Sequence, residues 1–168
     1  MKTLFIVRHA KSSWKDSSLS DFDRPLNKRG IRDVPDMGDR LKAQHILPDL
    51  MISSPANRAL TAAKGIAEQI GYSLANIVED DALYHASSRD IIQLIANTEN
   101  KHESLMIFGH NPGFTYLIND LSDFYLDNLP TTGICGIQFQ LDNWTDVHNQ
   151  KGIKAIFHGV LDNVNILI

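Results

Sequence analysis

The stretch Leu4-Phe5-Ile6-Val7-Arg8-His9 decides the fold. Its first four residues form a continuous β-prone apolar run, which is typical of a strand buried on both faces in a parallel sheet. The run ends directly in Arg8 and His9, so the strand carries two reactive side chains to its C-terminal end. Residues 11–26 are rich in Ser and Asp without clear periodicity. They predict a long loop just beyond the strand, and such loops in compact domains usually serve function.

Strand-like runs and helical patterns alternate along the rest of the chain. Asn27 is expected to cap one helix, and Ser54 is expected to cap the next, with Pro55 at its first helical position. The expected strands are 50–53, 77–78, 105–108, 134–141 and 153–160, and the expected helices are 27–44, 54–70, 88–96 and a segment from 109–113 to about 121. This alternation predicts an α/β fold, a three-layer sandwich with a mostly parallel central sheet and helices on both faces.

Three of these strands are followed by arginine or histidine residues. Arg8 and His9 follow the first strand, Arg58 comes just past the second, and His110 follows the strand at 105–108. Ligands of such sheets bind beyond the carboxyl ends of the strands, so we expect these side chains to share one crevice. Guanidinium forks match pairs of phosphate oxygens and keep their charge, and a neutral imidazole nitrogen can attack phosphorus. The sequence therefore predicts a phosphoryl ligand and a histidine nucleophile.

Composition narrows the classes of function. The 168 residues suit one domain over 1–168, and a formal charge of −4 with scattered Lys and Arg gives no basic stripe for nucleic acid. No apolar run approaches the roughly 20 residues of a membrane span. The single cysteine, Cys135, excludes an internal disulfide and fits a reducing compartment. We therefore expect a cytoplasmic protein without nucleic-acid or membrane partners.

Familiar catalytic motifs are missing from the sequence. The seven histidines form no H-E-x-x-H pair, and no aspartate cluster resembles a magnesium site, so we expect no metal and no cofactor. The phosphate-binding loop G-x-x-x-x-G-K-[ST] and the G-x-S-x-G elbow of serine hydrolases are also absent. Side chains must then supply the positive charge that a phosphoryl group needs.

Four blocks carry a family resemblance. They are Val7-Arg8-His9-Ala10, the segment Asp23-Arg24-Pro25-Leu26-Asn27-Lys28-Arg29-Gly30, Ser53-Ser54-Pro55 with Arg58-Ala59 and Thr61-Ala62, and Gly109-His110-Asn111-Pro112. The first resembles the Arg-His-Gly signature of the histidine phosphatase superfamily, with Ala10 in place of the usual glycine. Together the blocks resemble the short phosphohistidine phosphatase branch, the SixA-like proteins, and they occur in that family's order.

The resemblance implies a phosphoglycerate mutase-like fold and a division of roles. It makes His9 the nucleophile of a metal-independent phosphatase that works through a phosphohistidine enzyme intermediate. It also implies that Arg8, Arg58 and His110 hold the phosphoryl oxygens and stabilise charge in the transition state. For Arg24 two interpretations stay open: it binds substrate, or it ties the loop to the sheet.

One part of the family pattern has no clear counterpart. The larger mutase-like members carry a glutamate that protonates the leaving oxygen, and here only Glu79, Asp80, Asp81 and His85 are nearby candidates. A phosphohistidine leaves as an imidazole with an ordinary pKa of ~6.5, so it needs much less help from an acid than an alkoxide does. The missing acid therefore favours phosphoramidate substrates. The 168 residues leave no room for the large cap insertions that enclose small substrates in bigger relatives, so we expect the substrate to be a phosphohistidine on a protein.

Two alternatives remain. The same chemistry can act on a small phosphorylated metabolite, as a phosphomonoesterase of the same superfamily. The second alternative is a non-catalytic module that binds phosphorylated partners, although such a module has no need of the nucleophile His9.

Overall fold

The first strand lies inside the sheet. The computed structural model describes residues 1–159 and 166–167. In it β1 (Lys2–Arg8) pairs in parallel with β4 (Ser104–Gly109) and antiparallel with β5 (Ile134–Phe139). Leu4, Ile6 and Val7 are fully buried, on opposite faces of the strand. The interpretation of 4–7 as a strand buried on both faces is thus confirmed.

The sheet is mixed, with the order β3-β2-β4-β1-β5-β6-β7. The remaining strands are β2 (Leu50–Ser53), β3 (Val78–Glu79), β6 (Lys154–His158) and β7 (Ile166–Leu167). Pairing is parallel from β3 to β1 and antiparallel from β1 to β7. The two predicted late strands do lie together at one side, and the expected end of the second, Val160, falls outside the described residues.

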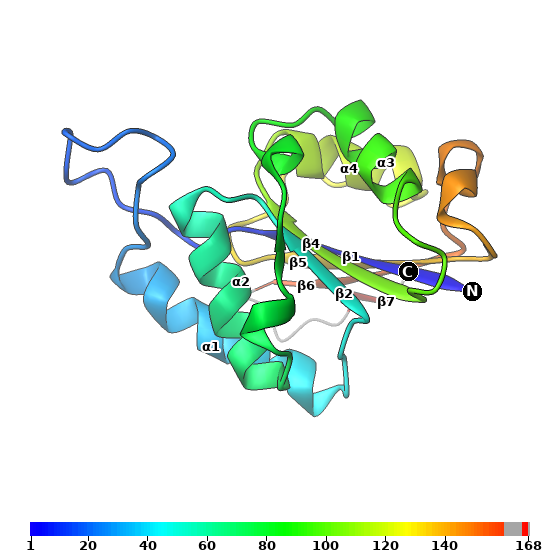
Figure 1. Ribbon diagram of the computed structural model, residues 1–168, viewed down its shortest axis with the longest axis horizontal. Coiled ribbons are helices and arrows are strands. Elements are labelled where there is room, and N and C mark those ends of the chain that lie inside the picture. The colour runs from blue at the N-terminus through cyan, green and yellow to red at the C-terminus, as the bar shows by residue number, and fades with distance from the viewer. Residues whose placement is uncertain (160–165, 168) are drawn as a thin grey trace.

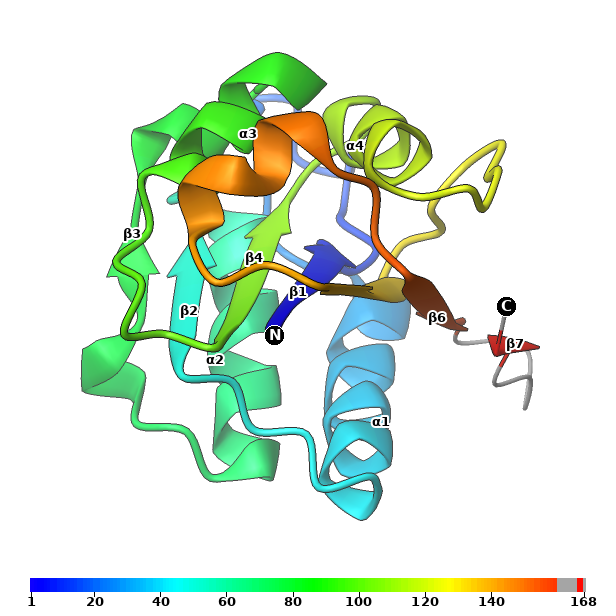
Figure 2. The same ribbon diagram turned by 90° about the vertical axis from the view of Figure 1, so that its right-hand side faces the viewer.

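Helices cover both faces of this sheet, which confirms the three-layer α/β sandwich. Figure 2 shows α1 (Lys28–Ala43) and α2 (Asn57–Ile70) below the sheet, with α3 (Ser88–Ala96) and α4 (Gly113–Leu121) above it. Short 3-10 helices complete the connections: η1 (Leu74–Asn76), η2 (Asp81–Leu83) and η3 (Trp144–Asn149). Each face has its own apolar core. No helix in residues 1–159 and 166–167 has the length and hydropathy needed to cross a bilayer.

The two helix starts differ in how well the sequence predicted them. The Asn27 side chain accepts a hydrogen bond from the Gly30 N–H at 2.9 Å, which confirms it as the N-cap of α1. The prediction for Ser54 and Pro55 is wrong, because α2 begins at Asn57 after the uncapped Ala56. The Ser54 hydroxyl instead lies 2.8 Å from Nε2 of the His110 ring, so this serine helps to orient a histidine of the crevice.

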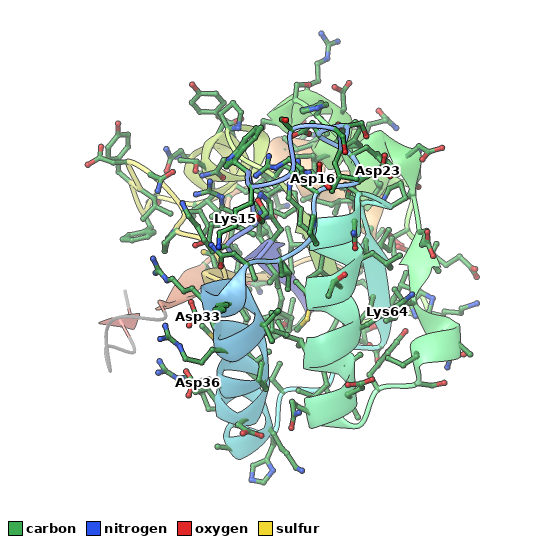
Figure 3. The ribbon with its side chains drawn as sticks, turned by 90° about the vertical axis from the view of Figure 1, so that its left-hand side faces the viewer. Lys15, Asp16, Asp23, Asp33, Asp36 and Lys64 are labelled. Carbon is green, nitrogen blue, oxygen red and sulfur yellow. The ribbon has the colours of Figure 1, made fainter. Side chains whose placement is uncertain are left out.

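The predicted loop leaves the sheet after β1 and returns to α1. Its base is closed by a bridge between Ser12 and Leu26 and by a hydrogen bond from the Asn27 N–H to the Lys11 carbonyl at 2.9 Å. A Cβ at Gly30 would collide with that carbonyl, so the close approach of loop and helix requires glycine there. Figure 1 shows the loop beyond the carboxyl end of β1, and in Figure 3 its labelled residues lie above the N-terminal ends of α1 and α2.

Candidate active site

His9 is the first residue beyond β1, and its ring is fixed by the next residue. Its Nδ1 lies 2.8 Å from the Ala10 carbonyl oxygen, an acceptor, so Nδ1 carries the proton. In the neutral ring the lone pair then sits on Nε2. Both His9 and Ala10 are buried, and the His9 N–H donates to the Gly109 carbonyl at 3.0 Å. The ring is thus held with Nε2 as its free basic nitrogen.

His110 lies beside His9 because their strands are parallel neighbours. Arg8 of β1 is in register with Gly109 of β4, so the residues that follow them emerge at the same edge. The two histidine rings are 5.1 Å apart between centroids. His110 Nε2 lies 2.8 Å from the Ser54 hydroxyl, while its Nδ1 is buried and has no hydrogen-bond partner within the described residues. That nitrogen is free to meet a ligand.

Arg8 and Arg58 line the same pocket as His9 and His110. Arg8 donates from Nη1 to the Leu129 carbonyl at 2.7 Å, and Arg58 donates from Nη2 to a carboxylate oxygen of Asp21 at 3.0 Å. In the part of the chain that the structure describes, the Nε atoms of both arginines are buried without an acceptor. Buried donors are nearly always paired, so two unpaired ones beside His9 indicate a place for an acceptor-rich ligand.

Asp21 joins the arginines to the loop, and the sequence analysis did not single it out. Its carboxylate accepts from Arg24 Nη1 at 2.8 Å, from Arg58, and from the Tyr84 hydroxyl at 2.9 Å. Partial burial raises the pKa of Asp21, but the hydrogen bonds from Tyr84 and Arg24 and the charge of Arg58 together hold that pKa well below its usual range. The only advance signal was its position three residues before Arg24 in a Ser/Asp-rich loop.

Arg24 contacts the loop and the crevice at once. Its Nε donates to the Ser13 carbonyl at 3.1 Å, its Nη2 contacts the Ser12 hydroxyl, and its guanidinium lies 3.3 Å from the centre of the Trp14 ring. These contacts tie the loop, and the same side chain also lines the pocket beside His9. The geometry therefore accommodates both interpretations left open by the sequence.

The five predicted site residues share one pocket of about 200 Å³. Its wall comprises Arg8, His9, Lys11, Ser12, Trp14, Arg24, Arg58, His85, His110, Asn111 and Thr131. Four of these side chains are cationic at neutral pH and none is a carboxylate. Such a pocket binds a compact anion through several charge-assisted hydrogen bonds. In the described ranges no three His, Cys, Asp or Glu side chains gather as a metal site.

The same surroundings keep both histidines neutral. Burial lowers the pKa of His9 to about 4, and the neighbouring charges of Arg58, Arg8 and Arg24 act in the same direction. Burial and the Arg58 charge lower the pKa of His110 to about 3. At pH 7 each imidazole is therefore uncharged, which for His9 is the nucleophilic form.

These shifts predict a loss of stability in mild acid. In the unfolded chain a histidine takes up its proton near pH 6.5, whereas folded His9 resists it until about pH 4. The unfolded state thus binds more protons between these values, and the free energy of unfolding falls as the pH falls. From pH 7 to pH 4.5 we expect His9 alone to cost about 2 kcal/mol. Urea unfolding of the native chain and of His9→Ala at both pH values measures this, and equal losses in the two proteins would contradict it.

Of the four candidate acids, only His85 lies at the pocket. Its Nε2 is 3.5 Å from an Asp21 carboxylate oxygen, and its backbone has a φ of 55°, an uncommon conformation for a residue other than glycine. Asp80 and Asp81 line a different cavity, and Glu79 lies in the edge strand β3. His85 is exposed at the surface.

Comparison with known proteins places this geometry in context. The model of the histidine phosphatase superfamily (branch 1) matches residues 4–87. A chloroplastic protein of uncharacterised function from Arabidopsis thaliana is 33% identical over 159 residues, which cover 90% of this chain and 72% of the plant protein. The matched segment of the family model contains His9, Arg24 and Arg58.

Solved structures share the fold. A SixA protein from Agrobacterium tumefaciens, a proposed phosphohistidine phosphatase, has a TM-score of 0.75 at 27% identity, covering 81% of this chain and 90% of that one. The protein histidine phosphatase SixA in complex with tungstate has a TM-score of 0.75 at 20% identity, with 94% of each chain covered. The α/β fold predicted from the sequence is therefore that of phosphoglycerate mutase-like proteins.

Proposed function

The chain belongs to the histidine phosphatase superfamily and is a phosphohydrolase, and we propose that His9 is its nucleophile. The observation that carries this proposal is the state of the His9 ring. Ala10 holds the proton on Nδ1 and burial keeps the ring neutral, in a pocket whose charged side chains are all cationic. A nucleophile with this preparation needs no base to activate it.

In the first step, we propose, His9 Nε2 attacks phosphorus. A nitrogen–phosphorus bond forms as the bond from phosphorus to the leaving group breaks, and its electron pair stays with the leaving atom. Arg8, Arg58 and His110 are the donors for the three phosphoryl oxygens, which is consistent with their buried nitrogen atoms that lack a partner in the described residues. For His110 this role requires the proton on Nδ1, with Nε2 accepting from the Ser54 hydroxyl. Arg24 supports the anion from the loop side.

In the second step, water attacks the phosphorus of phospho-His9. The nitrogen–phosphorus bond breaks, its electron pair returns to Nε2, and inorganic phosphate leaves. No metal or other cofactor takes part in either step of this proposal. The two displacements have lower barriers than a single attack of water on the substrate.

We propose protein phosphohistidine as the substrate class. The leaving imidazole needs little proton donation, and no carboxylate among the described residues lines the pocket to protonate an alkoxide. Similarity to the proposed phosphohistidine phosphatase SixA of Agrobacterium tumefaciens and to the tungstate-bound protein histidine phosphatase SixA supports this choice. The location of His85 keeps a small phosphoester as the second candidate, because an imidazole there could donate a proton to the leaving oxygen.

We also propose that residues 1–168 form a single domain and that the protein is cytoplasmic. The free Cys135 is in keeping with that location.

The test compares substrates in the presence of a chelator. We expect kcat/KM for a phosphohistidine peptide to exceed that for glycerol phosphate, an alkyl ester, by at least about 100-fold at pH 7, because no carboxylate among the described residues lines the pocket to protonate the departing alkoxide. His85→Ala should then slow the ester by about 10-fold or more while it changes the peptide rate less than about threefold. Faster hydrolysis of free phosphoesters than of the peptide would instead favour the metabolite phosphatase. Tight peptide binding without release of phosphate would favour a binding module.

A further inference from the structure

A second and larger cavity adjoins the phosphate pocket. It has a volume of about 730 Å³ and lies between α3 and the edge of the sheet formed by β2 and β3. Figure 2 shows these strands at one side of the sheet with α3 above them. His85 borders both cavities. Tyr84 lines the larger one, and its hydroxyl donates to Asp21, which also accepts from Arg58 of the phosphate pocket. We call this cavity the α3 groove.

The α3 groove is long enough for an extended chain. It runs from Tyr84 and His85, at the carboxyl edge of the sheet, to Glu99 and His102, which precede the first residue of β4. The six residues of β4 span about 20 Å at the usual rise of a strand. A segment of about six residues that starts at the phosphate pocket could thus reach the far end.

The two cavities have opposite charge. The α3 groove is lined by Asp80, Asp81, Asp90 and Glu99 and by no lysine or arginine, whereas the phosphate pocket is lined by four cationic side chains and no carboxylate. Glu99 is paired with Lys101 at 2.8 Å, but both side chains are exposed, so a cation of the partner can replace Lys101 there. Within residues 1–159 and 166–167 none of the three aspartates forms an ion pair. Asp90 belongs to the capping box of α3 and Asp80 accepts from the Ala82 N–H, so within the described residues Asp81 is the aspartate most available to a cation.

The floor of the α3 groove is apolar. Leu50 and Ile52 of β2, Val78 of β3 and Leu94 of α3 contribute to its lining. Val78 is 45% exposed, and no side chain in the described residues covers it fully. A partner could therefore bury aliphatic carbon there, and the methylene stem of a lysine or arginine does this while its charged end reaches an acid.

Resting on the proposed function, we propose that the α3 groove docks the phosphorylated protein. The occupant is an extended segment next to the phosphohistidine that carries lysine or arginine side chains. Its phosphoryl group enters the cationic pocket and its basic side chains lie against Asp81 and Glu99. The phosphoryl group is negative where the phosphate pocket is cationic, and the flanking side chains are positive where the adjoining α3 groove is acidic.

The experiment uses two synthetic peptides with one central histidine. One carries lysine and arginine on the flanks and the other carries glutamate at the same positions, and each is prepared with and without phosphorylation. We expect the 168-residue chain to show a KM at least fivefold lower for the basic phosphopeptide at low salt, a preference that shrinks as salt is raised. Free phosphoramidate, which cannot reach the α3 groove, is the reference substrate.

Asp81→Lys is the deciding variant, because Asp81 is exposed and the cap of η2 is its neighbour Asp80, so the change leaves that cap in place. It should remove the preference for the basic peptide and leave phosphoramidate turnover within twofold. Asp81→Lys combined with Glu99→Lys should reverse it. The matched control is Asp39→Lys on α1, which covers the opposite face of the sheet and should keep the preference.

The outcomes separate this proposal from the proposed function. Equal KM values for both phosphopeptides in the native protein would overturn docking in the α3 groove and leave the phosphatase intact. If no substrate were turned over, the proposed function would fail, and the affinities of the unphosphorylated peptides would then decide docking. Tighter binding of the basic peptide, lost in Asp81→Lys, would still support it, and equal affinities would overturn it.

Discussion

His9→Ala is expected to reduce phosphate release from a phosphohistidine peptide by at least about 10,000-fold. The substitution removes Nε2, the ring nitrogen that carries the lone pair because the Ala10 carbonyl holds the proton on Nδ1 of the neutral ring. Without it, water must displace the leaving group in a single step, and the loss of a nucleophile costs more than the loss of any one donor. Steady-state phosphate release at pH 7 measures the change.

The loss of activity in His9→Ala is informative only if the variant is correctly folded. Trp14 lies at the pocket with its ring stacked on Arg24 and is 74% exposed, whereas Trp144 is fully buried. Tungstate should therefore change the Trp14 fluorescence in His9→Ala as it does in the native protein. His148→Ala, which changes an exposed histidine of η3, should keep full activity. Activity in His9→Ala above a hundredth of the native value would contradict the assigned role.

Arg58→Ala is expected to lower kcat/KM by about 100- to 1,000-fold. Arg58 is buried beside His9 and His110, and its Nε has no acceptor in the part of the chain described. A donor aimed at the charge that develops on the phosphoryl oxygens contributes at about this level. The fall should appear in kcat as well as in KM, since the charge is greatest in the transition state.

Arg58→Lys distinguishes geometry from charge. Lysine keeps the positive charge but cannot donate to a phosphoryl oxygen while it also holds Asp21 as the guanidinium fork does. We therefore expect it to recover less than a tenth of the lost activity. The matched control is Arg89→Ala, which changes an exposed arginine of α3 and should leave kcat/KM unchanged. Full activity of Arg58→Lys would show that charge alone suffices.

The sequence predicted the scaffold well where local rules govern. The apolar run at 4–7, the Asn27 cap and the limits of α3 follow from burial, capping and periodicity, and each is found in the structure. It also placed Arg8, His9, Arg58 and His110 in one crevice, because parallel strands carry their carboxyl ends to the same edge. These inferences required no knowledge of side-chain contacts.

Tertiary contacts account for what the sequence did not predict. Ser54 has the residue type and the following proline of a helix cap, but its hydroxyl is hydrogen-bonded to His110, the residue that follows β4. Asp21 lies in a segment without periodicity, and its partners Arg58 and Tyr84 are 37 and 63 residues away. Links of this length leave no periodic signal in a single sequence. The α3 groove went unpredicted for the same reason.

The most direct test of the covalent mechanism is to trap the phosphoenzyme. The native protein is mixed with a peptide carrying radiolabelled phosphohistidine, quenched in alkali within milliseconds, digested and mapped. The account predicts a label on the peptide that contains His9, stable in alkali and lost in acid, and absent from His9→Ala. Phosphate release at full rate with no label on His9, or a label on another residue, would contradict it.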